Sequence, residues 1–164
     1  MSLVILMKLL HVLTGIWFIS GLLGRWIALD HAAKATDVQN VTTLVGLGGR
    51  FERLMVIPGS MAVLLFGFVV AGLQGQPVLG FLQGAGSNWL LVSIVLYLSA
   101  IPLIPLIFLP RGKRFEAALA DAQTRGEVTP ALKAAFEDRV VFAAHVYELL
   151  MVLVVTTLMV TKPF

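Results

Sequence analysis

The chain has 164 residues, of which 59% are hydrophobic and 13% are charged, with a formal net charge of +3 and no cysteine. Soluble domains average about 45–50% apolar and about 25% charged residues, so this composition predicts an integral membrane protein. The lack of cysteine excludes disulfides, thiolate metal sites and cysteine nucleophiles. The basic residues lie in short segments beside apolar runs, which favours membrane topology over nucleic-acid binding.

Four apolar stretches are long enough to cross a bilayer, whose hydrocarbon core of about 30 Å requires roughly 20 mostly apolar residues. They cover approximately residues 3–24, 54–73, 89–109 and 140–161. No internal repeat or low-complexity tail is present. We therefore expect a single domain over residues 1–164, folded as an all-α integral membrane four-helix bundle in contact with lipid.

The distribution of lysine and arginine predicts the orientation of this bundle, because short cytoplasmic loops are enriched in both. The opposite side carries only Lys8 and Lys162, and the connection at 74–88 has no charge. Both termini are therefore predicted on the outer, periplasmic side of the cell inner membrane. The connections after the first and third spans hold the other ten basic residues: Arg25, Lys34, Arg50, Arg53, Arg111, Lys113, Arg114, Arg125, Lys133 and Arg139.

The two cytoplasmic connections carry helix signals, which predict helical cytoplasmic extensions of the bundle. Thr36 in "TDVQ" is a predicted helix N-cap, and Thr129 is another, with Pro130 at the first helical position. Nothing after Pro130 is expected to break the helix, so the last span should end one helix of about 30 residues. In the third span, Pro102 and Pro105 are predicted to kink the helix.

The spans contain few ionisable side chains, and such groups usually face the bundle interior and are functional candidates by default. They are Lys8 and His11 in the first span, and His145 and Glu148 in the fourth. Lys8 is close enough to the outer end to reach the interface. The other three side chains are therefore the candidate site residues.

His11 lies on a helix face with small residues, which allow a neighbouring helix to approach closely. This face is therefore predicted to contact protein. Three interpretations remain open for His11: a hydrogen-bonded packing residue, a cofactor or metal ligand, and a proton relay. The same face continues through Thr14, Gly15, Phe18, Gly21 and Arg25.

His145 and Glu148 are three residues apart and share one helix face. They are interpreted as a second cofactor ligand, a proton relay or a mutual hydrogen bond. At about 1.5 Å per residue, His11 lies about 4 Å outside the midpoint of its span and His145 about 8 Å inside its own. Glu148 is closer in depth to His11, so we expect a His11–Glu148 pair rather than bis-histidine ligation. A single-histidine haem, or a metal held by His11 with Met7 or Glu148, remains open.

Two segments carry a family resemblance. "KLLHVLTGIWFISGLLGR" and "GRFERLMVIPGSMAVLLFG" resemble the first two helices of a family of predicted four-helix bacterial membrane proteins of unknown function. That family is distantly similar to CopD-type copper-resistance membrane proteins and HemJ-type protoporphyrinogen oxidases. The resemblance implies a metal- or haem-binding role for His11, with Trp17 completing the pattern. Spans two and three lack the further basic residue expected of HemJ-like proteins, so the resemblance does not decide whether the chain is an enzyme.

Two functional hypotheses follow. The first is a redox module that binds haem b, or alternatively copper, at His11, with His145 and Glu148 as a second ligand or proton relay. The second is an accessory or structural subunit of a larger membrane complex, without a cofactor, in which His11 and Glu148 form a buried polar pair. The expected partners are the lipid bilayer and either other membrane subunits or further copies of the chain, and no nucleic acid.

Overall fold

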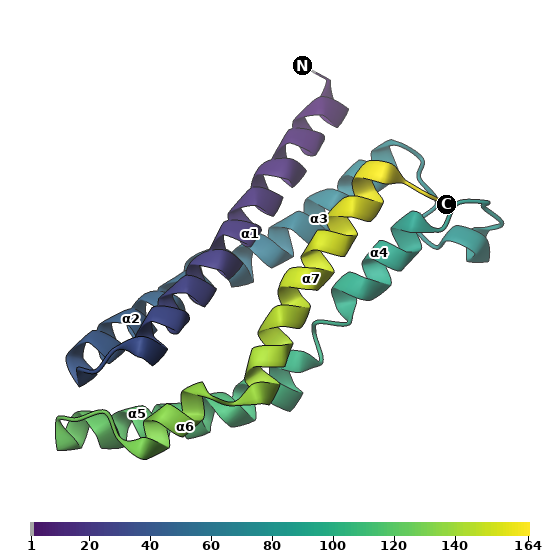
Figure 1. The fold of residues 1–164 in the computed structure, drawn as a ribbon. Coiled ribbons are helices and arrows are strands. Elements are labelled where there is room, and N and C mark those ends of the chain that lie inside the picture. Colours follow the sequence, from purple (N-terminus) through teal and green to yellow (C-terminus); the bar gives the residue numbers. More distant parts are fainter. Residues whose placement is uncertain (1) are drawn as a thin grey trace.

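The computed structural model describes residues 2–164, which contain helices and no strand. Three long helical segments and the shorter helix α4 (Trp89–Leu98) run side by side (Figure 1). The N- and C-termini lie at the same end of this bundle, called the terminal end below. At that end the carbonyl oxygen of Phe164 accepts hydrogen bonds from the amides of Asn88 and Trp89. The connection before α4 contains one short 3-10 turn, η2 (Gly80–Gln83).

The all-α prediction is confirmed, but the helices clearly long and apolar enough to cross a membrane number three among the described residues. They cover Leu3–Lys34, Val38–Leu73 and Pro130–Thr161, the last of which has a short break at 137–138. The predicted third span, 89–109, is not one continuous helix. α4 ends at Leu98, and a turn at 99–102 separates it from the π-helical segment η3 (Ile104–Phe108). The physical reason is that the prolines in this segment lack the amide proton that a continuous helix requires.

The first helix, α1 (Leu3–Lys34), packs closely against α3 (Ile57–Leu73) through glycines. A Cβ atom on Gly59 of α3 would lie 3.0 Å from the Cα of Phe18 in α1, and one on Gly21 of α1 would lie 2.6 Å from the Cβ of Met55, in the turn that precedes α3. Only glycine allows the two backbones to approach this closely. The small-residue face of α1 therefore contacts protein, as predicted. Beside these contacts lies a buried apolar core of Phe18, Leu22 and Val56.

Two π-helical turns interrupt the helices, and each lies just before a proline. In η1 (Glu52–Val56) the amide of Ile57 donates to the carbonyl of Glu52, five residues back, and Pro58 follows. In η3 the amide of Leu109 donates to the carbonyl of Ile104, and Pro110 follows. Because proline has no amide proton and its ring crowds the carbonyl four residues earlier, the wider π turn accommodates it without ending the helix.

The end opposite the termini carries a layer of three helices: α2 (Val38–Phe51), α5 (Leu109–Arg125) and α6 (Pro130–Phe136). In Figure 1, α5 and α6 extend sideways from the end of α7. These three helices share their own apolar core, in which the side chains of Val41, Ala122 and Leu132 are fully buried. The predicted helical extensions are therefore present, and they pack together as one layer.

The helix starts in this layer agree only partly with the predicted caps. Thr129 caps α6 as predicted, because its side chain accepts a hydrogen bond from the amide of Leu132. The cap predicted at Thr36 was wrong by one residue: Asp37 caps α2. The predicted unbroken helix after Pro130 was also wrong. Asp138 caps a new helix, α7 (Arg139–Thr161), since its carboxylate accepts the first free amides of that helix.

Candidate functional site

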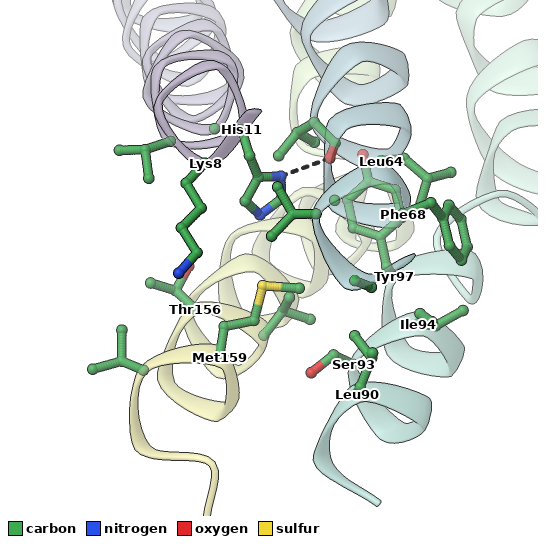
Figure 2. A pocket seen from close by; sticks show the side chains of 18 of the residues that line it. Lys8, His11, Leu64, Phe68, Leu90, Ser93, Ile94, Tyr97, Thr156 and Met159 are labelled. Atoms are coloured by element: carbon green, nitrogen blue, oxygen red, sulfur yellow. Dashed lines mark hydrogen bonds between the residues drawn. The ribbon is translucent and has the colours of Figure 1, made fainter. Parts of the chain in front are cut away.

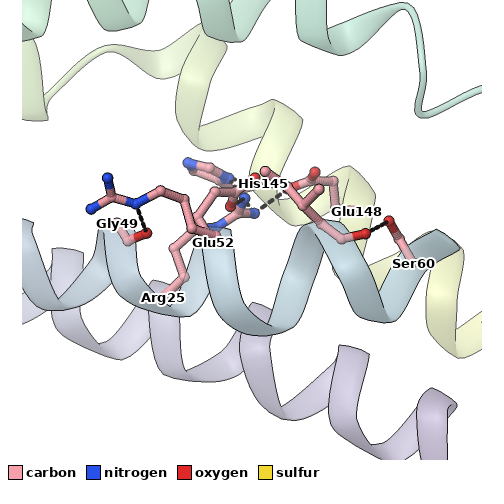
Figure 3. Close-up of polar contacts among 8 residues, drawn as sticks. Arg25, Gly49, Glu52, Ser60, His145 and Glu148 are labelled. Atoms are coloured by element: carbon pink, nitrogen blue, oxygen red, sulfur yellow. Dashed lines mark hydrogen bonds and ion pairs between the residues drawn. The ribbon is translucent and has the colours of Figure 1, made fainter. Parts of the chain in front are cut away.

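Arg25 is at the centre of a buried polar cluster that joins three segments of the chain. Its guanidinium in α1 donates hydrogen bonds to the carboxylates of Glu52 in η1 and Glu148 in α7 (Figure 3). The Arg25 side chain is 10% exposed and that of Glu148 is 14% exposed, whereas the Glu52 side chain, at the edge of the cluster, is 36% exposed. Buried charges are stable only when they are paired and hydrogen-bonded, and Arg25 supplies that pairing for both carboxylates.

His145 completes this cluster, which we call the Arg25 cluster: Arg25, Glu52, His145 and Glu148. The Nδ1 atom of His145 lies 3.0 Å from Nη2 of Arg25 and 3.2 Å from Oε2 of Glu148. Its ring stacks on Phe108, with ring centroids 4.9 Å apart and planes inclined by 26°. The imidazole is thus held by polar contacts at one nitrogen and by an aromatic ring on its face.

The two π turns place side chains at this cluster. Glu52 is the first residue of η1, and Phe108 is the last residue of η3. The guanidinium carbon of Arg25 lies 5.9 Å from the centroid of the Phe108 ring, within cation–π range. π turns inside α-helices occur frequently at functional sites. Here one side chain from each π turn, Glu52 and Phe108, lies against Arg25.

A cavity of about 530 Å³ opens beside the Arg25 cluster, and we call it the His145 cavity. It lies between the bundle and the helical layer, and aromatic side chains form much of its wall. The residues that line it include Arg25, Trp26, Phe108, Arg111, Asp138 and His145.

Asp138 stabilises the corner between η3, α5 and α7 beside this cavity. Its carboxylate pairs with Arg111 and accepts hydrogen bonds from the amides of Val140 and Val141 at 2.9 and 3.3 Å. Burial of the carboxyl raises the pKa of Asp138, but these hydrogen bonds and the Arg111 charge outweigh that effect. The pKa of Asp138 therefore lies below its ordinary value.

His11 belongs to a different site, nearer the terminal end. Its Nδ1 lies 2.9 Å from the carbonyl oxygen of Val63, so Nδ1 carries the proton and donates it. Nε2 is then the nitrogen with a free lone pair. It has no hydrogen-bond partner within residues 2–164, and it is not fully buried. The ring lies against Gly67, where a Cβ atom would be 3.0 Å from Cε1 of His11.

A second cavity, of about 470 Å³, surrounds the His11 ring, and we call it the His11 cavity. Figure 2 shows His11 and the thioether of Met159 on facing helices. Most of the wall is apolar. The hydroxyls of Ser93, Tyr97 and Thr156, which also line the cavity, each donate to a backbone carbonyl. His11, by contrast, lines the cavity with one ring nitrogen, Nε2, that has no hydrogen-bond partner within residues 2–164.

The structure separates residues that sequence analysis had grouped together. Glu148 pairs with Arg25 and His145, so the predicted His11–Glu148 pair is not formed. Arg25 lies 14 positions after His11 on the same helix, which corresponds to about 21 Å. The depth estimate failed because α1 continues to Lys34, ten residues past the predicted end of the first span. Nδ1 of His145 and Oε2 of Glu148 lie 3.2 Å apart, within the distance required by the alternative of a mutual His145–Glu148 hydrogen bond.

Two further residues that the sequence associated with a site at His11 do not line the His11 cavity. Met7 is not one of the residues that line it, whereas Met159 is. Trp17, which the family resemblance associated with His11, is 41% exposed on the outer surface of the bundle and does not line the cavity either. Trp17 therefore takes no part in the site around His11.

Sequence reasoning missed Arg25 and Glu52 as site residues. Arg25 was counted as a loop charge, although the helical spacing from His11 through Phe18 and Gly21 placed it on the packed face of α1. That spacing was the signal that could have identified it. Glu52 gave no comparable signal, because the π turn that orients it interrupts the helical period.

The described residues, 2–164, contain no group of three or more His, Asp or Glu residues arranged to hold a metal ion. The fold is that of an all-α integral membrane protein with buried polar groups between its helices. Residues 5–163 match the family described as "Predicted integral membrane protein (DUF2269)", and the chain belongs to this family. No curated protein and no solved structure matches the chain significantly.

Proposed function

We propose that the protein binds haem b in the His11 cavity and acts as a membrane redox module. The observation that carries this proposal is the hydrogen bond from His11 Nδ1 to the Val63 carbonyl. A histidine that ligates iron commonly donates its other ring N–H to a carbonyl or carboxylate, which fixes the tautomer and the ring orientation. Haem needs only axial ligands from the protein, so a three-residue metal site is not required.

The cavity around His11 suits a largely apolar prosthetic group. Its volume of about 470 Å³ falls within the range of about 300–1,000 Å³ typical of ligand pockets. Lys8 and Lys162 line it near the terminal end, and their ammonium groups would pair with the carboxylates of a bound haem. Nε2 of His11 would bind the iron, and the thioether of Met159, which also lines the cavity, would be the candidate for a second ligand. Bound haem supplies one-electron transfer.

The proposal is tested by the visible spectrum of the protein purified in mild detergent from haem-replete cells, before and after reduction with dithionite. We expect a Soret band that is lost in His11→Ala. His31→Ala is the matched control, because His31 is an exposed histidine on the same helix whose Nδ1 bonds to the carbonyl of Ile27. A colourless wild-type preparation, or a band unchanged in His11→Ala, would reject the proposal.

A second pair of variants tests the cavity rather than the ligand. Gly67→Ala adds a methyl group 3.0 Å from Cε1 of His11, so it should displace the ring and reduce haem content. Gly72→Ala, on the same helix with nothing within 4 Å of the added carbon, should leave haem content unchanged. Equal haem content in both variants would contradict a site at His11.

We also propose that the segment 89–109 crosses the membrane as a broken fourth span. Two features support this. Its α4 portion is apolar and lies beside α7, and both termini lie at the same end of the bundle. The helical layer would then face the cytoplasm, in agreement with the lysine and arginine distribution, and the termini would face outward.

A further inference from the structure

We propose that the Arg25 cluster is a proton-binding site that exchanges one proton with the His145 cavity. This proposal is independent of any cofactor at His11. Along α1, the buried side chains of Phe18 and Leu22 separate the two sites. The proposal rests on the charges of the cluster, on the contacts of one nitrogen atom, and on access from the cavity.

The charges of the cluster do not balance when His145 is neutral. One guanidinium, that of Arg25, faces the two carboxylates of Glu52 and Glu148. The Glu52 side chain is 36% exposed, so its carboxylate is partly solvated, whereas the Glu148 side chain is 14% exposed. The unbalanced negative charge is costly at the poorly solvated Glu148, and binding one proton removes it.

The charged groups on the elements around the cluster do not supply the missing positive charge. Arg53, next to Glu52, donates to the carbonyl of Gly49 on its own helix and is exposed. Arg111 lines the same cavity but pairs with Asp138. Asp30 pairs with Lys34, and Arg114 is exposed at the cavity rim. The net charge of the site is therefore set by the four residues of the Arg25 cluster.

The Nδ1 atom of His145 has two hydrogen-bond contacts that exclude each other. Arg25 can only donate, so the contact of 3.0 Å to Nη2 requires Nδ1 without a proton. An ionised Glu148 can only accept, so the contact of 3.2 Å to Oε2 requires Nδ1 with a proton. The same geometry serves both states, and the position of one proton decides which contact is the hydrogen bond.

Access to the cluster is through the other ring nitrogen of His145. Nε2 has no partner within residues 2–164 and is not fully buried, and His145 lines the cavity. In the step that we propose, a hydronium ion in the cavity gives a proton to Nε2 and becomes water, and the Nδ1 proton passes to Oε2 of Glu148. The products are a neutral Glu148 and a neutral His145 protonated at Nε2, whose Nδ1 now accepts from Arg25. The reverse step releases the proton to the cavity.

The experiment follows the tautomer of His145 and the protonation of Glu148 together. Nitrogen NMR of the histidine-labelled full-length protein, with infrared spectra of the carboxyl groups, is recorded as the pH is lowered. We expect the protonated nitrogen of His145 to change from Nδ1 to Nε2 as the band of one protonated carboxyl group appears. His145→Gln identifies the NMR signal. A purely structural ion cluster would show one tautomer at every pH, which would overturn the proposal.

Glu148→Gln assigns the carboxyl group. This variant should lose the infrared band and keep His145 in one tautomer across the pH range. Glu116→Gln is the matched control, because it makes the same change on an exposed residue of α5 and should leave both signals unchanged. A band that persists in Glu148→Gln would contradict the assignment. If that variant does not fold, the tautomer change in the wild-type protein still decides the proposal.

Discussion

The guanidinium of Arg25 in α1 donates a hydrogen bond to the carboxylate of Glu148 in α7, although the two residues are 123 positions apart in the sequence. The same guanidinium also bonds to Glu52. Arg25 thus links the first long helix to the last one and to the π turn between α2 and α3. The Arg25 cluster is a cross-link within the bundle as well as a site.

Replacing Arg25 should therefore be strongly destabilising. Arg25→Met leaves the Glu148 carboxylate, whose side chain is 14% exposed, without its cation, and removal of one partner of a buried ion pair costs about 3–5 kcal/mol. The Glu52 side chain is 36% exposed, so loss of its pairing adds less. Thermal unfolding in detergent measures the loss as a lower melting temperature. Arg53→Met is the control, because Arg53 is exposed, and it should change stability by no more than about 0.5 kcal/mol. Equal melting temperatures for the two variants would show that the cluster adds no stability.

The glycine contacts between α1 and α3 predict that two Gly→Ala substitutions change the free energy of unfolding in opposite directions. Gly59→Ala places a methyl group 3.0 Å from the backbone of Phe18, so the helices must separate, at a cost of about 1–3 kcal/mol. Gly46→Ala on α2 meets nothing within 4 Å and should stabilise the helix by about 0.5–1 kcal/mol. Denaturant unfolding measures whether the free energy of unfolding falls in Gly59→Ala and rises in Gly46→Ala. A neutral Gly59→Ala would mean that α1 and α3 are not packed as closely as described.

Asp138 should make stability depend on pH in the acidic range. Its native pKa is lowered below the ordinary value of 3.8, so its contribution is present above that value and is lost as the pH falls through the native pKa. Asp138→Asn keeps an N-cap but removes the charge that pairs with Arg111, whereas Asp138→Ala also removes the cap, which is worth about 1 kcal/mol.

The measurement is the melting temperature of each variant as a function of pH. The difference between wild type and Asp138→Asn should be constant near neutral pH and should shrink under acidic conditions. A difference that grows as the pH falls would contradict the lowered pKa.

The orientation of the chain can be tested cleanly because the natural sequence has no cysteine. Single cysteines at Phe164 and Ser87, at the terminal end, should react with a membrane-impermeant thiol reagent in intact cells. A cysteine at Thr124, in the helical layer, should react only after the membrane is permeabilised. If the segment 89–109 does not cross the membrane, Ser87 and Thr124 should label on the same side.

The sequence allowed the helical class, the long apolar segments and the packed face of α1 to be predicted, because each depends on local composition or on the helical period. Other features depend on contacts that spacing does not encode. The break before α7 arises because Asp138 can satisfy both the amides of α7 and the charge of Arg111. The partner of Glu148 could not be obtained from span midpoints, because α1 continues to Lys34, ten residues past the predicted end of the first span.

Each π turn is equivalent to one residue inserted into an α-helix, and this has a consequence for the length of the chain. Deletion of a single residue within Glu52–Val56 would restore ordinary α-helical winding and rotate Glu52 by about 100° relative to α3. The carboxylate would then leave Arg25 while every other side chain of the cluster kept its identity. In this segment the number of residues is itself a structural constraint, separate from which residues they are.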